Sequence, residues 1–254
     1  MTIASLVNQL LPRSWRPASV ASARLVKCSG HVVQGGPFRG MRYINRAHCS
    51  ALAPKLAGTY ELEIHEYLPR LFAGPPDVFV DVGAAEGYYA VGTLFAGWCK
   101  RVIAFEADPA AYTACRELMR LNEIGPEKLD LRGACHPAAL QDVLANATRP
   151  ALMMDVEGFE ALLLDPLRVP ALARCRILLE YHDFVLPGLS VELHRRMTPT
   201  HHVSPIELAP RNTTDLVTED WLLRLLPGSI RRRALAEDRP FEAHGWLWME
   251  PKDA

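Results

Sequence analysis

The chain has 254 residues, of which 49% are hydrophobic and 22% are charged, so it fits one large domain or one domain with appendages. This composition excludes disordered, collagen-like and small disulfide-stapled proteins. The balance of 28 basic against 29 acidic residues argues against non-specific nucleic-acid binding by the whole chain. The charge is unevenly placed, because residues 1–60 contain eight Lys or Arg and no Asp or Glu.

The N-terminal segment allows two interpretations. Its basic, acid-free composition is typical of an organelle transit peptide, yet it continues into a Gly- and aromatic-rich stretch that looks folded. The apolar run at residues 3–11 is far below the roughly 18 residues of a membrane span. Six scattered cysteines without a C-x-x-C pair predict free thiols in a reducing compartment, so we expect a soluble, cytoplasmic protein.

The pattern of the chain changes near Pro75-Pro76. We expect residues 1–73 to be an N-terminal leader and residues 74–254 to be the main domain. The leader ends in an amphipathic segment, residues 60–72, interpreted as a helix. The almost wholly apolar run at residues 78–82 predicts a strand buried on both faces. A tight turn over residues 83–87 and a helix over residues 88–96 follow it.

Strands and helices then alternate along the chain. The pattern predicts strands at residues 102–106, 129–133, 151–155 and 176–181, and helices at 109–122, 137–144 and 159–164. Asp108 is the expected N-cap of the first of these helices, and Pro109 its first residue. Five strands separated by helices predict an α/β fold with a doubly wound parallel sheet. A helix at 190–197 and strands at 202–208 and 245–250 are interpreted as an appended antiparallel pair.

Acidic residues mark the predicted ends of four strands. They are Asp81, Glu106, Asp155 and Glu180. Ligands of open parallel sheets bind beyond the carboxyl ends of the strands, and carboxylates gathered there favour hydroxyls, amines or cations.

The turn after the first strand reads Asp81-Val-Gly-Ala-Ala-Glu-Gly-Tyr-Tyr. A dinucleotide fingerprint needs glycine where this chain has Ala85 and Tyr88, so a pyrophosphate is poorly served. The turn suits a nucleoside without phosphates whose amino-acid tail passes over Gly83. Glu106 stands where an acid can accept the ribose hydroxyls.

Three motifs carry a resemblance to a known family: the turn above, Phe105-Glu-Ala-Asp-Pro109, and Met154-Asp-Val-Glu-Gly-Phe-Glu160. They resemble the FkbM-type S-adenosylmethionine-dependent methyltransferases, as do residues 36–43 and 56–61 of the leader. The resemblance implies a Rossmann-like class I methyltransferase core with the leader as a lid. The implied cofactor contacts are Asp81, Gly83, Ala84, Ala85, Gly87, Tyr60, Glu106, Ala107, Asp108 and Asp155.

Glu106 would hold the ribose in this scheme, and Ala107 and Asp108 would border the adenine. Ala85 and Glu86 depart from the Asn and apolar residue more usual in the family's turn, and the resemblance fades beyond Tyr181. Tyr60 and Tyr67 either contact the cofactor or form only the apolar face of the leader helix. One of Tyr88 and Tyr89 is expected at the pocket mouth and the other in the core.

A hydroxyl acceptor must lose its proton when it is methylated, which needs a His, a carboxylate or a metal-bound oxygen. The densest candidate group is Glu180-Tyr-His182-Asp183 together with Asp155 and Glu157. We expect His182, Asp155 and Glu180 to be catalytic. Asp155, Glu180, His182 and Asp183 could hold Mg²⁺ or Mn²⁺, or His182 could act as a base without metal. In the alternative reading these acids only bind loop amides.

Other candidates are weaker. His194, His201 and His202 could join the metal ligands, although paired histidines in a strand more often point one in and one out. Trp221, Trp246 and Trp248 are expected to cover the sheet edge or form a dimer contact. The basic run at residues 231–233 is a solvated face or an anion site.

The sequence as a whole predicts a methyltransferase acting on the oxygen of a small-molecule or sugar-like acceptor, with S-adenosylmethionine as cofactor. We expect no nucleic-acid or membrane partner and allow for a homodimer. A non-catalytic S-adenosylmethionine-binding protein and an NAD-linked oxidoreductase are the alternatives.

Overall fold

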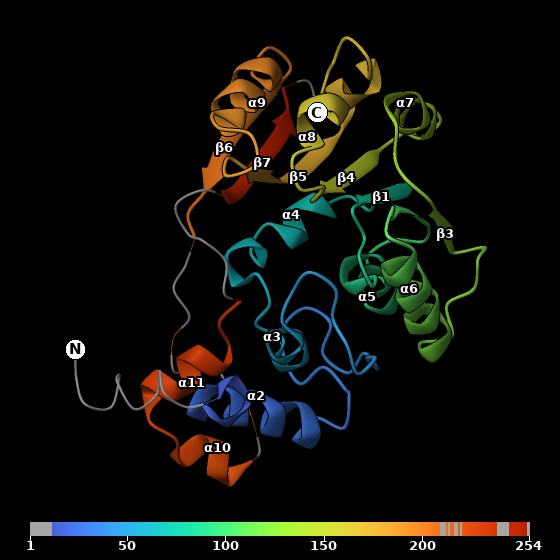
Figure 1. Ribbon diagram of the computed structural model, residues 1–254. Helices are drawn as coiled ribbons and strands as arrows, with labels where there is room; N and C mark the ends of the chain where they lie inside the picture. The colour runs from blue at the N-terminus through green and yellow to red at the C-terminus, as the bar shows by residue number, and fades with distance from the viewer. Residues whose placement is uncertain are drawn as a thin grey trace. The chain divides into compact units, whose positions relative to one another are not determined.

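The computed structural model describes residues 12–208, 212, 214, 215, 218, 220–237 and 244–252, and Figure 1 labels their elements. These residues form two compact units. The first takes in those within 1–62 and 210–238, and the second those within 63–209 and 239–254. The division into a leader ending at residue 73 and a following domain remains a prediction.

The second unit is built on a seven-stranded sheet in the order β3-β2-β1-β4-β5-β7-β6. Strands β1 to β5 pair in parallel, whereas β7 is antiparallel to both β5 and β6. The predicted doubly wound, mostly parallel sheet with an antiparallel pair from the chain's end is therefore confirmed. The strands are β1 Val78–Val82, β2 Val102–Phe105, β3 Leu129–Arg132, β4 Pro150–Met154, β5 Arg176–His182, β6 His201–Ile206 and β7 His244–Pro251.

Helices cover both faces of this sheet (Figure 1). On one face lie α4 Leu68–Leu71, α5 Tyr88–Phe95 and α6 Pro109–Leu121. On the other lie α7 Pro137–Ala145, α8 Glu160–Leu163, the 3₁₀ helix η3 Pro170–Arg174, and α9 Leu189–Met197. Apolar side chains between α7, α8, α9 and the sheet form one continuous core, including Val80, Leu152, Leu140, Leu163 and Leu193. Burying this surface is the main favourable contribution to folding of the unit.

Local signals set several helix boundaries. The Asp108 carboxylate accepts from the backbone N–H groups of Ala110 and Ala111, both at 2.8 Å, and Pro109 takes the first helical position of α6. Asp108 is therefore the N-cap, as predicted, because it satisfies two donors that have no partner within the helix.

The single helix predicted over residues 60–72 is wrong. The chain forms a 3₁₀ turn, η2 Leu62–Ile64, and then the one-turn helix α4. Glu61 has a left-handed backbone with φ of 50°, and Pro69 cannot donate the N–H that a continuous helix would need. Tyr60, Glu61 and Glu63 therefore do not share one helix.

The first unit joins segments from both ends of the chain. Its helices are η1 Arg13–Trp15, α2 Pro17–Cys28, α3 Leu52–Ala57, α10 Trp221–Leu225 and α11 Gly228–Ala234. The Arg24 guanidinium on α2 donates two hydrogen bonds, of 2.9 and 2.7 Å, to the Asp220 carboxylate that caps α10. Ser22 Oγ donates to the carbonyl of Ala234 on α11 at 2.9 Å. Within the described residues, no helix is both long enough and apolar enough to cross a membrane.

Candidate functional site

The turn between β1 and α5 lies against the neighbouring strands. Backbone N–H groups of Gly83 and Ala84 donate to the carbonyl of Phe105 at 2.9 and 3.0 Å. Gly83 has φ of 87°, and a Cβ there would lie 1.7 Å from the carbonyl oxygen of Asp155. Only glycine fits at this position, because the turn and the end of β4 approach each other backbone to backbone.

Glu106 joins this turn to the end of β2. Its carboxylate accepts from the N–H of Ala85 and from the N–H of Asp108, both at 2.7 Å. The acid expected to hold a ribose therefore also shapes the loop in which that ribose would lie. Ala107 and Asp108 are exposed beside it, where a flat ring could approach.

Buried polar side chains lie under the same turn. Asp81, one residue before the end of β1, is 3% exposed, and Glu86 is fully buried. Burial and the neighbouring carboxylates raise the pKa of the Cys115 thiol to about 12. Tyr88 and Tyr89 are both buried with their rings edge to face, so neither marks a pocket mouth.

A second polar cluster lies beyond the ends of β4 and β5. His182, the last residue of β5, has Nε2 3.5 Å from Asp155 Oδ1 and 3.5 Å from Glu157 Oε2. Its Nδ1 lies 2.7 Å from Oε1 of Glu160. The pairing of β4 with β5 brings the two strand ends together, as expected for neighbouring parallel strands.

Opposing effects set the protonation of His182. Burial lowers the pKa of the imidazole, and the hydrogen bond to Glu160 with the charges of Asp155 and Glu157 outweighs it, so the pKa of His182 is raised. The ring is thus a basic group held among three carboxylates.

Asp183 and Glu180, which were also predicted to belong to this cluster, have other surroundings. Asp183 accepts from the N–H and hydroxyl of Ser190, at 2.8 and 2.6 Å, and stabilises the start of α9. Glu180 lies inside β5, is 1% exposed, and offers a carboxylate oxygen within 4.8 Å of one from Asp155. The structure therefore places Asp155 near both His182 and Glu180, but among the described residues His182 and Glu180 belong to different groups of possible metal ligands, and Asp183 belongs to neither.

Glu157 and Glu160 contact the His182 ring more closely than the sequence suggested. Glu157 contributes an oxygen next to His182, and Glu160 is fully buried behind the ring. Both belong to the Met154–Glu160 motif, but no local pattern assigned Glu160 a partner. The pairing depends on where the one-turn helix α8 places its first residue.

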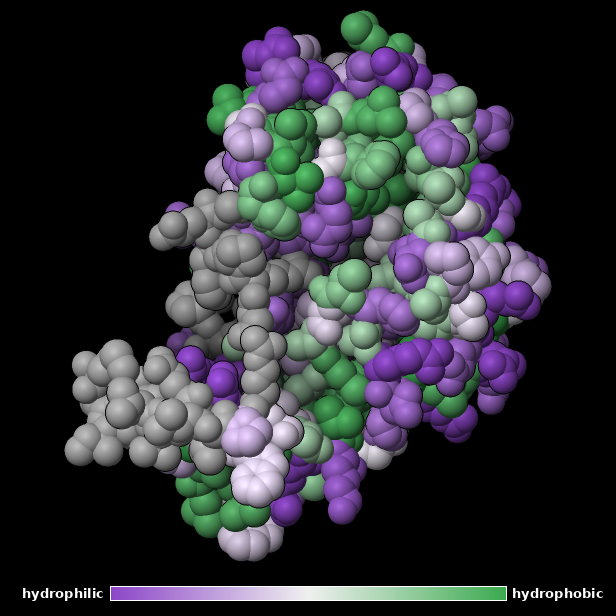
Figure 2. Space-filling model, viewed as in Figure 1, coloured by the Kyte–Doolittle hydropathy of each residue, from purple (hydrophilic) through white to green (hydrophobic). Residues whose placement is uncertain are grey.

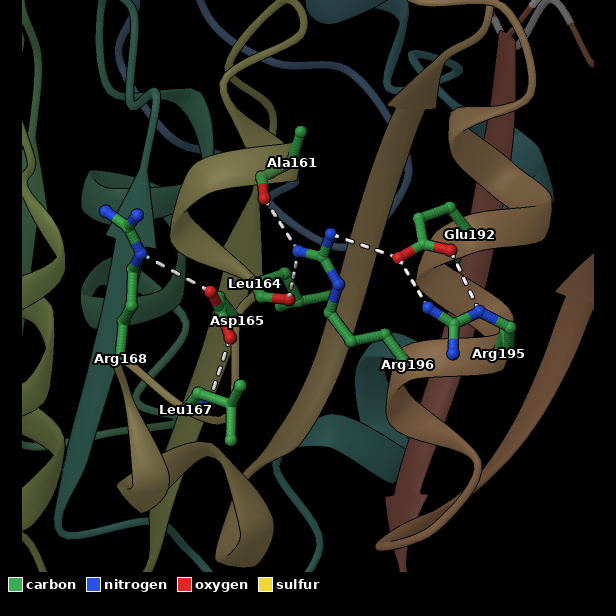
Figure 3. A network of polar contacts seen from close by, with 8 residues as sticks. All are labelled: Ala161, Leu164, Asp165, Leu167, Arg168, Glu192, Arg195 and Arg196. Atoms are coloured by element: carbon green, nitrogen blue, oxygen red, sulfur yellow. Dashed lines mark hydrogen bonds and ion pairs between the residues drawn. The ribbon is translucent and has the colours of Figure 1, made fainter.

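Helix α8 is held in place from α9 (Figure 3). Arg196 donates to the carbonyls of Ala161 at 2.6 Å and Leu164 at 3.1 Å. It also pairs with Glu192 at 3.3 Å. A four-residue helix has mostly unpaired carbonyls, so this guanidinium satisfies the end of α8 while Glu160 occupies its beginning.

Exposed apolar side chains surround the cluster, and Figure 2 shows hydrophobic surface gathered over α8. Phe159 and Leu162 come from the α8 segment, and residues 184–186 follow β5. The Phe184 ring lies 5.5 Å from the imidazole of His182. The two segments touch, because a Cβ at Gly158 would lie 2.7 Å from Val185.

The remaining predicted candidates fall outside this cluster. His201 is buried and His202 exposed, which confirms the expected one-in, one-out pair. Among the described residues, none of the groups that could hold a metal includes His194, His201 or His202. Trp246 and Trp248 are buried on β7, whereas Trp221 is 66% exposed. All six cysteines lie in the described ranges and are free thiols, as predicted.

The solved structures described next are distant in sequence from this chain. No protein-family profile matches the chain. The human methyltransferase 10 domain containing protein is 11% identical over 94% of this chain and 98% of its own, with a TM-score of 0.49. A Streptococcus pneumoniae protein with suggested tRNA (m1A22) methyltransferase activity is 15% identical over 73% and 69%, with a TM-score of 0.45.

The C-terminal domain of precorrin-6Y C5,15-methyltransferase from Rhodobacter capsulatus is 16% identical over 72% of this chain and 85% of its own, with a TM-score of 0.41. Likeness at this level carries no argument about function. The fold class depends on this chain's own sheet. Its five parallel strands followed by the antiparallel pair β7 and β6 confirm the Rossmann-like architecture predicted for a class I methyltransferase core.

Proposed function

We propose that this protein is an S-adenosylmethionine-dependent methyltransferase of the FkbM type that methylates a hydroxyl oxygen of a small-molecule or sugar-like acceptor. The observation that carries the proposal is the contact of Glu106 with the turn after β1. Its carboxylate bonds the N–H of Ala85 and of Asp108 and so lies beside both the glycine turn and the end of β2.

A nucleoside without phosphates suits this arrangement. Ribose hydroxyls would share the oxygens of Glu106, each of which has a second lone pair. The methionine part would lie over Gly83, near Asp81, and the adenine would lie beside Ala107. A pyrophosphate would instead need glycine at position 85, where this chain has alanine.

The neighbouring cluster supports transfer to oxygen. In the proposed reaction a lone pair of the acceptor oxygen attacks the methyl carbon, and the carbon–sulfur bond breaks with its electrons going to sulfur. The hydroxyl proton passes to a basic group among Asp155, Glu157 and His182 when no metal is bound, or to solvent water when these side chains hold a divalent cation. The sulfonium needs no further activation, so the protein's main contribution is to align the reacting atoms and exclude water.

The apolar rim around His182 favours an organic acceptor over a nucleic acid. Phe184 and Val185 would contact its carbon skeleton while its hydroxyl faces the polar cluster. A cytoplasmic location, a homodimer, and a lid role for Tyr60 belong to the same proposal. So does a divalent cation, Mg²⁺ or Mn²⁺, that orients the acceptor.

The deciding experiment is isothermal titration of the protein with S-adenosylmethionine and with S-adenosylhomocysteine. Glu106→Ala should weaken binding of both by about 1–3 kcal/mol, because hydrogen bonds to a charged group are lost. Asp130→Asn is the matched control, since the Asp130 carboxylate on β3 pairs with Arg132 of the same strand. This control should bind like the wild type.

Other outcomes separate the alternatives. No heat and no thermal shift with either nucleoside would overturn the assignment. Stabilisation by NAD instead would favour an oxidoreductase. A third outcome is that the protein binds S-adenosylmethionine tightly but forms no S-adenosylhomocysteine with any acceptor in a broad panel of hydroxylated compounds. That outcome would favour a non-catalytic binding protein.

A further inference from the structure

The cluster of Asp155, Glu157 and His182 differs from an ordinary group of surface acids. The side chain of His182 is 5% exposed, whereas those of Asp155 and Glu157 are 30% and 60% exposed. The imidazole is therefore buried, while the side chains of Asp155 and Glu157 are partly exposed. Oδ1 of Asp155, the carboxylate oxygen that faces the imidazole, is itself buried, so the cluster combines two buried donor atoms with the more exposed carboxylate of Glu157.

The distances fit a shared ligand. One atom of each side chain lies within 4.8 Å of the other two, and Nε2 of His182 is 3.5 Å from each carboxylate oxygen. With bonds of about 2.1 Å at right angles, neighbouring ligands of an octahedral cation lie about 3 Å apart. The imidazole nitrogen would need to approach each carboxylate oxygen by about half an ångström, and the two carboxylate oxygens, which lie within 4.8 Å of each other, would close up to complete one face of such an octahedron.

Glu160 supplies an independent observation. It is fully buried, accepts from the N–H of Val156 at 3.3 Å, and lies 2.7 Å from Nδ1 of His182. A histidine that ligates a metal usually donates its other N–H to a carboxylate, which fixes the ring and its tautomer. With its proton on Nδ1, His182 presents the lone pair of Nε2 to Asp155 and Glu157.

We propose that Asp155, Glu157 and His182 form a binding site for one divalent cation, with Glu160 as a positioning residue that orients the imidazole. Two carboxylates and one imidazole favour a hard cation that accepts nitrogen, and Mn²⁺ meets this description. Three protein ligands leave three positions of an octahedral shell for water or an acceptor.

This site also defines a substrate class, an inference that rests on the proposed function. An acceptor with two adjacent oxygens, such as a vicinal diol or a hydroxyl next to a carbonyl, can occupy two of the remaining positions. Phe184, 5.5 Å from His182, would then contact the carbon skeleton that carries those oxygens.

The test is a direct titration of the full chain with Mn²⁺ in the absence of S-adenosylmethionine. The concentration of unbound Mn²⁺ is measured by electron paramagnetic resonance. The wild type should bind one Mn²⁺ per chain. Glu157→Gln should weaken binding at least tenfold, and this exposed position should tolerate the change. Asp165→Asn removes an acid that pairs with Arg168 outside the cluster (Figure 3), so this variant should bind like the wild type.

Glu160→Gln tests the positioning role. It keeps the size of the side chain and loses its charge, so Mn²⁺ affinity should fall about 10–100-fold, as for other outer-shell partners of metal-bound histidines. Its affinity for S-adenosylmethionine should stay at the wild-type value, a separation that general misfolding would not produce.

Three outcomes would overturn the proposal: no stoichiometric Mn²⁺ binding by the wild type, equal affinities of Glu157→Gln and Asp165→Asn, or unchanged affinity in Glu160→Gln. Catechol serves as the probe of the substrate class, and it should lower the water-proton relaxation enhancement of bound Mn²⁺. An unchanged enhancement would reject that class. Because the Mn²⁺ and catechol measurements need no nucleoside, their failure is distinguishable from failure of the S-adenosylmethionine titration.

Discussion

Ala85 occupies a backbone conformation that suits glycine better. Its φ is 47°, between Gly83 and Gly87 at 87° and 92°. A left-handed conformation costs an L-residue roughly 1–2 kcal/mol, which glycine avoids while losing more chain entropy on folding.

Ala85→Gly should therefore raise the free energy of unfolding by about 0.5–1 kcal/mol, as measured by urea denaturation. The adjacent Ala84→Gly is the control. Ala84 has no positive φ and is 6% exposed, so this change should lower stability by a similar amount. Equal effects of the two substitutions would contradict the account.

Gly83→Ala should have the opposite effect. The new Cβ would lie 1.7 Å from the Asp155 carbonyl oxygen and 3.2 Å from Cγ1 of Val156, so the turn and the end of β4 must separate. We expect a loss of at least about 2 kcal/mol of stability, with loss of S-adenosylmethionine binding. Gly133→Ala, with nothing within 4 Å of the added Cβ, should change neither quantity. If Gly83→Ala bound S-adenosylmethionine with the affinity of the wild type, the close approach of the turn to the end of β4 would be refuted.

At the scale of elements, the site depends on a helix too short to be stable alone. Helix α8 has four residues and connects Glu160 at its start to the carbonyls bound by Arg196 at its end. Isolated helices of this length do not form in water, so α8 is stabilised by its contacts with α9 and the sheet.

Arg196→Met should lower the free energy of unfolding by about 1–2 kcal/mol, because carbonyls of α8 lose a charged donor. Arg195→Met on the same helix is the matched control. The Arg195 side chain is 73% exposed and pairs with Glu192 at the surface, so its loss should change stability by less than about 0.5 kcal/mol. Chemical denaturation of both variants tests the comparison, and indistinguishable midpoints would show that α8 does not need this contact.

At the scale of the whole molecule, a buried histidine links stability to pH. His201 is 1% exposed, and its Nε2 lies 3.0 Å from the carbonyl oxygen of Cys175. Burial lowers the pKa of His201, and the charge of Lys252 acts in the same direction. The folded protein therefore holds this ring neutral at a pH where the unfolded chain already binds a proton.

Stability should fall as pH drops through about 6.5, the ordinary pKa of an unfolded histidine, until the lowered pKa of the folded state is reached. His201→Gln should remove this part of the slope between pH 7.5 and 5.5 in urea denaturation. The exposed neighbour His202→Gln should keep it. An unchanged slope in His201→Gln would assign the pH dependence to other groups.

Much of the fold followed from local patterns. The apolar run at Val78–Val82, the turn after it, and the Asp108-Pro109 start of α6 all formed as predicted, because sequence-adjacent atoms decide them. The amphipathic segment before Pro75 did not form its expected helix. A periodic pattern there did not reveal the left-handed backbone of Glu61 or the separate one-turn helix that begins at Leu68.

The amino-acid sequence by itself thus determined the order of strands and helices, the glycine turn, and the placement of Asp81, Glu106 and Asp155 near strand ends. The tertiary structure decided which side chains meet. The sequence already grouped Glu157 with His182, whereas the placement of α8 brings Glu160 to His182, and Ser190 draws Asp183 to the start of α9. These contacts depend on the packing of separate elements, which no local sequence pattern encodes.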